Sequence, residues 1–190
     1  LPGYSKKSGS LCYSPFSIST AVAMIYAGAR GETERQIADA LRFTLAQDQL
    51  HPALNALGLD LDPPSPGAPV PETGFALSIA NSIWGQVDYP FQMAYLGLLG
   101  GIYGARMGWL DFADAQQSRL TINNWVSDRT LGKIENLFAP GILTEDTKLV
   151  LANAVYFKAE WKTPFLQQTR EAPFYLRYGK QITVSMMSRR

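Results

Sequence analysis

Residues 149–157 form an uncharged run of nine residues between Lys148 and Lys158. Apolar side chains occupy both faces of this run, which one amide, Asn153, interrupts. Such a pattern predicts a strand in the middle of a sheet, covered on both sides. A buried amide without a partner costs about 1 to 3 kcal/mol, so we expect Asn153 to be paired and to fix the strand register or serve a function.

A second segment repeats this pattern, because residues 80–84 match residues 152–156 in polarity and spacing. The repetition predicts two strands of one sheet. Alternate residues define one face, which we expect to be the core side, and it carries Phe75, Leu77, Ile79, Asn81 and Ile83 in the first strand and Leu149, Leu151, Asn153, Val155 and Phe157 in the second. The opposite faces carry alanine and serine, and these small side chains leave room for a covering helix.

The natural cover for the small-residue face is a helix that begins after Asp114. Asp114 and Gln117 match a capping box at its start. Ile122, Trp125 and Val126 then line one side of the predicted helix.

Two further helices are predicted near the start of the chain. Ser14 has the character of an N-cap and Pro15 that of a first helical position, in a buried helix that ends near Gly28. Thr33 and Gln36 match a capping box, which predicts a short second helix.

The rest of the chain completes the pattern. Five prolines among residues 62–71 predict a surface loop within a single domain. We expect strands at 75–86 and 106–112, a helix at 90–103, and a hairpin of residues 174–178 and 181–187 around Gly179. Helices and strands are interspersed without regular alternation, which predicts an α+β fold, with residues 1–190 as one domain.

Composition excludes several function classes. The 190 residues are 46% hydrophobic, enough for a packed core, and 17 basic against 16 acidic residues give no argument for binding nucleic acid or an anionic membrane. The uncharged run 93–105 is too short to span a bilayer. Ser14, Pro15 and nearby hydroxyl residues interrupt the run after Lys7, which argues against a secretory signal peptide. A single cysteine, Cys12, excludes an internal disulfide.

The sequence predicts no catalytic residue, no metal site and no cofactor. A Ser-His-acid triad needs an oriented imidazole, and the one histidine, His51, lies in a weakly patterned segment. One His and one Cys cannot form a zinc shell. The Gly-Lys pairs at Gly132 and Gly179 lack the Ser or Thr of a phosphate loop.

Several segments, taken together, resemble the serpin family of serine protease inhibitors. They are 13–21 (YSPFSISTA), 28–33 (GARGET), 79–84 (IANSIW), 122–126 (INNWV), 130–134 (TLGKI) and 149–157 (LVLANAVYF) with Trp161. Their order and spacing also match. The resemblance covers only about the first half of a serpin, so we expect the family's first helix and everything after the strand ending near Met187 to lie outside this chain.

The resemblance implies a partial serpin-like fold, with helices packed around a large central sheet and a second, smaller sheet. In the family a protease cleaves an exposed reactive loop, which inserts as a new strand into the large sheet and carries the acyl-bound enzyme with it. The implied protein is a suicide inhibitor without catalysis of its own, and its implied partner is a serine or cysteine protease. The strand 147–158 looks like the border of the opening. The helix with Ile122, Trp125 and Val126 looks like the one that must shift.

The resemblance also implies roles for four residues. Ser14 and Ser17 look like the serines beneath the opening point, and Asn153 lies on the strand above them. Trp161 looks like the tryptophan at the top of the sheet, where the loop first inserts. The residue types leave ordinary roles open, namely an N-cap, a packed small residue, a locally satisfied amide and aromatic packing.

Other properties stay open at this stage. The reactive bond is not in this chain, so the chain does not specify a target protease. The alternatives are a non-inhibitory serpin that acts as a small-molecule carrier or chaperone, and an inactive truncated fragment. Family members activated by sulfated polysaccharides carry basic residues on a helix near residues 46–55, where this chain has no Lys or Arg, so we do not expect heparin activation. The resemblance implies an extracellular location, and a cytoplasmic one stays open.

Overall fold

The computed structural model describes residues 13–61, 75–103, 107–166 and 168–188. Their contacts group them into two compact units. The larger unit extends to Phe157, and the smaller one contains residues 158–188 together with Phe75 and Ala76.

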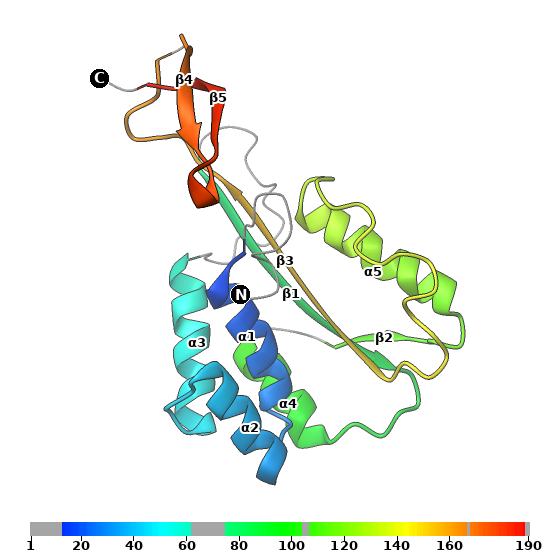
Figure 1. The fold of residues 1–190 in the computed structure, drawn as a ribbon. Coiled ribbons are helices and arrows are strands. Elements are labelled where there is room, and N and C mark those ends of the chain that lie inside the picture. Colours follow the sequence, from blue (N-terminus) through cyan, green and yellow to red (C-terminus); the bar gives the residue numbers. More distant parts are fainter. Residues whose placement is uncertain (1–12, 62–74, 104–106, 167, 189–190) are drawn as a thin grey trace. The chain divides into compact units, whose positions relative to one another are not determined.

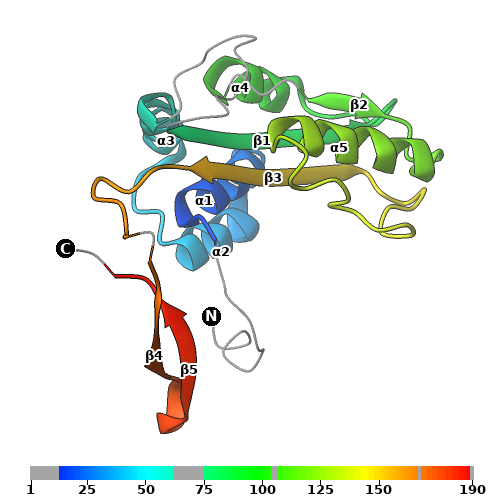
Figure 2. The ribbon, with the colours of Figure 1, turned by 90° about the horizontal axis from the view of Figure 1, so that it is seen from above.

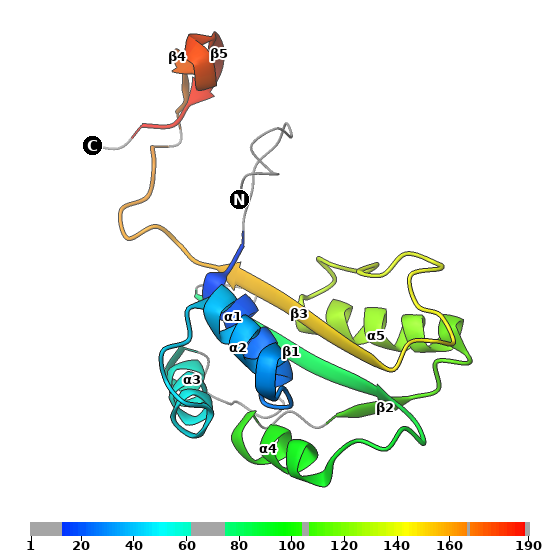
Figure 3. The ribbon, with the colours of Figure 1, turned by 60° about the horizontal axis from the view of Figure 1, so that its bottom comes forward.

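Three strands form the sheet of the larger unit, in the order β2-β1-β3. β1 spans Ala76–Gln86, β2 spans Gly108–Leu110 and β3 spans Leu149–Lys158. β2 pairs with β1 in parallel, whereas the β1 and β3 arrows point in opposite directions (Figure 3). Within the described residues β3 is an edge strand, so the predicted middle position is not what this sheet shows. The apolar run of β3 is explained by helices on both faces of the sheet.

Helix α5, Ala115–Arg129, covers the small-residue face of the sheet, as the sequence predicts. Ile122 and Val126 are fully buried against alanines of β1 and β3. The Trp125 ring meets the Trp84 ring edge-on, with centroids 6.2 Å apart. Small strand residues let the helix approach closely, and this face is therefore well buried.

Helices α1, Pro15–Tyr26, and α4, Met93–Tyr103, pack on the other face of the sheet (Figure 1). Ile83 of β1 is fully buried there, beside Met24 of α1. Most other large residues of this face are half-buried, and Phe157 is 66% exposed. The face that the pattern assigns to the core is therefore less buried than the alanine face.

Helix α2, Gly31–Leu41, begins earlier than the sequence predicts. Its N-cap is Arg30, which makes no side-chain capping bond, so the predicted capping box of Thr33 and Gln36 is wrong. The Gln36 Nε2 atom donates instead to Glu32 Oε1 at 2.8 Å. Gln36 therefore bonds to an exposed side chain of the same helix and does not cap its start.

Helix α3, Gln47–Leu61, extends beyond the region 46–55 and contains Pro52. Next to that proline, His51 is 1% exposed, and its Nδ1 atom lies 2.7 Å from the Tyr103 hydroxyl oxygen of α4. Burial, and then the charge of Arg30, lower the pKa of His51 below its ordinary value. The neutral His51 imidazole therefore packs between α3 and α4 and bonds to Tyr103.

The smaller unit contains an antiparallel hairpin of β4, Arg170–Tyr175, and β5, Gln181–Met186. A 3-10 turn, Arg177–Gly179, joins the two strands. Gly179 adopts a φ of +77°, which glycine accepts without strain. The predicted hairpin around this glycine is confirmed, but its first strand spans Arg170–Tyr175 rather than residues 174–178. None of the described helices is both long and apolar enough to cross a membrane.

Candidate sheet-opening site

The Asn153 side chain joins β3 to two other elements. Its Nδ2 atom donates to Ser17 Oγ of α1 and to Asn81 Oδ1 of β1, the latter at 2.6 Å. The Ser17 carbonyl oxygen lies 3.5 Å from the same Nδ2 atom. The expectation that Asn153 is paired is therefore confirmed. We call Ser17, Asn81 and Asn153 the polar tie.

The start of α1 positions Ser17 within the polar tie. Ser14 is the N-cap of the helix, and the Ser17 N–H donates to Ser14 Oγ at 3.2 Å. Pro15 occupies the first helical position, where a missing N–H costs nothing. Ser17 is completely buried. Ser14 thus takes the ordinary capping role and acts on the polar tie only through the helical turn that it stabilises.

Asn81 is a member of the polar tie that the predicted site residues omit. It occupies the position in β1 that corresponds to Asn153 in β3. The repeated Ala-Asn pattern of the two strands was the available signal, since it places both amides on one face of the sheet. What the repetition does not specify is that the two side chains bond to each other.

The hydrogen bonds of the polar tie make a modest contribution to the stability of the sheet. A neutral hydrogen bond contributes about 0.5 to 1.5 kcal/mol net, so two such bonds contribute about 2 kcal/mol to the closed arrangement. Asn153 and Asn81 are half-buried, so water can replace the lost partners when the bonds open. Ser17, in contrast, is completely buried, so its hydroxyl depends on the partners within the protein.

The outer edge of β3 has no strand beside it in the sheet that the structure describes. In the sheet that the structure describes, residues 149–155 have β1 as their only strand neighbour. An edge strand presents N–H and C=O groups that can pair with a further strand. Asn153 lies midway along β3, and its side-chain bonds run to β1 and to α1.

The remaining predicted site residues take other positions. Ile122, Trp125 and Val126 belong to the face of α5 that covers the sheet. Trp161 lies in the smaller unit, is 70% exposed, and meets the Phe165 ring edge-on at 5.5 Å. The roles of α5 and Trp161 in loop insertion stay predictions.

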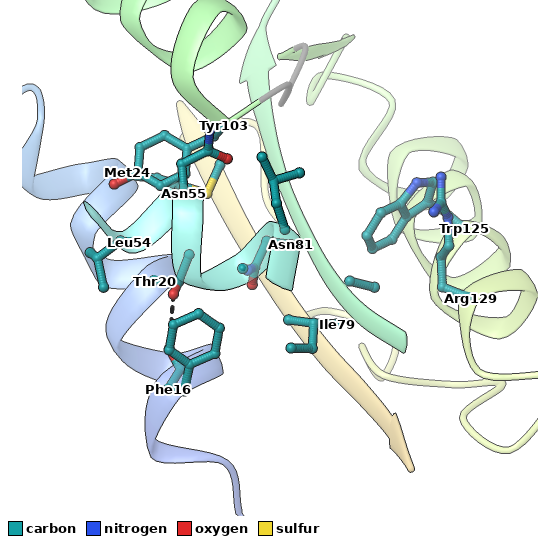
Figure 4. A pocket seen from close by; sticks show the side chains of 13 residues that line it. Phe16, Thr20, Met24, Leu54, Asn55, Ile79, Asn81, Tyr103, Trp125 and Arg129 are labelled. Carbon is teal, nitrogen blue, oxygen red and sulfur yellow. Dashed lines mark hydrogen bonds between the residues drawn. The ribbon is translucent and has the colours of Figure 1, made fainter. Parts of the chain in front are cut away.

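A cavity of about 280 Å³ adjoins the polar tie. It is lined by residues of α1, α3, β1, α4 and α5, with Asn81 on its wall (Figure 4). Thr20 of α1 also lines it, but its hydroxyl is occupied as a donor to Phe16 O at 2.9 Å.

No metal-holding cluster of His, Cys, Asp or Glu occurs among the residues that the structure describes.

Sequence comparison connects this arrangement to a known family. The sequence profile of the family described as "Serpin (serine protease inhibitor)" matches residues 4–190. A leukocyte elastase inhibitor from Equus caballus is 40% identical over 185 residues, which cover 96% of this chain and 47% of that protein. The leukocyte elastase inhibitor from Homo sapiens is 38% identical over 181 residues, 94% of this chain and 46% of that protein.

Solved structures agree with the sequence match. Ovalbumin from emu (Dromaius novaehollandiae) superposes with a TM-score of 0.80 at 28% identity, covering 94% of this chain and 48% of the ovalbumin chain. The structure named "Cleaved Serpin 42Da" gives a TM-score of 0.80 at 30% identity, covering 98% of this chain and 48% of that one. The chain spans about half the length of the relatives it matches. It has a partial serpin-like α+β fold and belongs to the serpin family of serine protease inhibitors.

Proposed function

We propose that the protein carrying this chain inhibits a serine protease by taking its cleaved reactive loop as a new strand beside β3. The chain supplies the receiving edge and the polar tie that controls it, and performs no catalysis. The observation that carries the proposal is the position of Asn153. Its side chain binds α1 and β1, while the outer edge of the same strand has no strand partner within the described sheet.

Strand addition supplies the free energy for this mechanism. A strand that inserts beside β3 satisfies a row of backbone groups and buries apolar surface, which outweighs the loss of the two bonds of the polar tie. The tie therefore sets how readily the sheet opens rather than whether the final state is stable. We assign Ser17 and Asn153 this sheet-opening role, with Asn81 as their partner and Ser14 as the helix cap.

The target is proposed as a serine protease, and elastase is the first enzyme to test because the curated relatives carry the name leukocyte elastase inhibitor. The experiment mixes the complete protein with elastase-like, chymotrypsin-like and trypsin-like enzymes. An adduct that survives denaturing electrophoresis is the expected result for one of them. The same enzyme with its active-site serine blocked is the control, and it should form no adduct because the acyl bond cannot form.

Cleavage without an adduct, by every enzyme tested, would contradict inhibition. That result would favour the second candidate, a non-inhibitory serpin. A small-molecule binding assay would then test whether the cavity beside Asn81 holds a ligand. Extracellular and cytoplasmic locations both fit this proposal, and no part of it depends on heparin.

A further inference from the structure

Residues 131–147 connect α5 to β3 without forming a helix or strand. This connecting segment turns back at the end of α5 and runs beside that helix to the start of β3 (Figure 1). Two other views place it on the side of β3 away from β1 (Figures 2 and 3). The connecting segment therefore lies beside the strand position that the proposed function requires.

Asn123 of α5 holds the connecting segment at Phe138. The Asn123 Nδ2 atom donates to Phe138 O at 3.0 Å, and the Phe138 N–H donates to Asn123 Oδ1 at 2.9 Å. One side-chain amide thus pairs both backbone polar groups of one residue. Asn123 is 2% exposed, so water competes little for these bonds. The connecting segment has no regular backbone hydrogen bonds of its own, and these two bonds to Asn123 fix its middle.

Other contacts hold the connecting segment along its length. Arg119 is 7% exposed and donates through Nη1 to the same Phe138 oxygen at 3.2 Å. The Ile134 N–H donates to Thr130 Oγ1 at 3.1 Å, near the start of the segment. Leu143 is buried in the cluster that α5 forms with β1 and β3. The bonds at Phe138 are the polar attachment between the two ends.

We propose that Asn123 is a positioning residue that keeps the connecting segment closed beside β3 and so limits how fast a strand inserts there. This inference rests on the proposed function. An inserting strand needs the edge of β3 and also the space next to it. The polar tie holds β3 against β1 and α1, whereas the amide of Asn123 holds the connecting segment in the space beside β3. Ile122 and Val126 are fully buried in the cluster with the alanines of β1 and β3, whereas Phe138 is only partly buried against it, so the segment can detach at Phe138 while α5 stays on the sheet.

The test compares Asn123→Ala with Asn124→Ala in the complete protein, because Asn124 is an exposed residue of the same type on the same helix. Hydrogen exchange of the Phe138 amide should be at least about tenfold faster in Asn123→Ala, since its acceptor is lost. The fraction of protease trapped per cleavage should rise, because faster insertion competes better with release of the enzyme. Asn124→Ala should change neither quantity.

A milder variant covers the case in which Asn123→Ala does not fold. Arg119→Met removes one donor to Phe138 O and keeps the packing of the aliphatic stem, so it should shift both quantities less and in the same direction. If the wild-type protein forms no adduct, the proposed function fails, while exchange at Phe138 still reports on the attachment. If the wild type traps a protease and the trapped fraction is unchanged in both variants, the positioning role is wrong, even when stability falls.

Discussion

Replacement of the central amide tests the polar tie directly. Asn153→Leu removes the Nδ2 donor that binds Ser17 Oγ and Asn81 Oδ1. Two neutral hydrogen bonds contribute about 2 kcal/mol, and apolar packing of the new side chain at a half-buried position returns up to about 1 kcal/mol. The closed sheet should therefore lose about 1 to 2 kcal/mol, which favours opening by about 5-fold to 30-fold.

Heat-induced polymerisation of the complete protein measures this opening, because an open position beside β3 can accept a strand from a second copy. The rate should rise for Asn153→Leu, and the strand should still fold because leucine suits an apolar run. Asn124→Leu is the matched control, since Asn124 is exposed on α5 and should leave the rate unchanged.

A double-mutant cycle makes the expectation sharper. Asn81→Leu should also accelerate polymerisation, and the combination with Asn153→Leu should be less than additive by about 1 kcal/mol, because both variants lose the same bond. A polymerisation rate of Asn153→Leu within about twofold of wild type, or full additivity in the cycle, would refute the control of sheet opening by the polar tie.

Three other predictions address stability. Gly108→Ala should lower the melting temperature, because the added Cβ would clash with the six-membered ring of Trp84, whereas Gly100→Ala, with nothing within 4 Å, should not. Burial holds the pKa of His51 below its ordinary value, so the folded state loses stability as pH falls below about 6.5. Urea unfolding at about pH 7.5 and about pH 5 should therefore show a smaller loss of unfolding free energy for His51→Gln than for the wild type. Ser14→Ala should reduce the free energy of unfolding by about 1 kcal/mol through loss of the N-cap, and an unchanged urea midpoint would contradict this.

Local patterns predicted many of the elements and one covering layer. Ser14 and Asp114 both accept the N–H bonds expected of N-caps, at 3.2 Å from Ser17 and 3.0 Å from Gln117. The small residues of β1 and β3 predicted a close helix, and α5 covers them. These predictions succeed because capping and face alternation depend on residues close in sequence.

Other features depended on neighbours that the local pattern does not contain. The segment around Pro52 is weakly patterned, yet it lies within α3, where buried His51 packs against Tyr103 of α4. The capping box at Thr33 did not form, because α2 starts at Gly31. In each case packing or local alternatives outweighed the sequence signal.

The sequence alone determined that two matching strands carry an amide on the same face, because alternation requires it. Only the tertiary structure decided that Asn153 bonds to Asn81, 72 residues away, and to Ser17, 136 residues away. It also decided that β3 lies at an edge of the described sheet. Side-chain partners and strand order come from the packing of distant segments, and the periodicity of any one segment is the same for every possible neighbour.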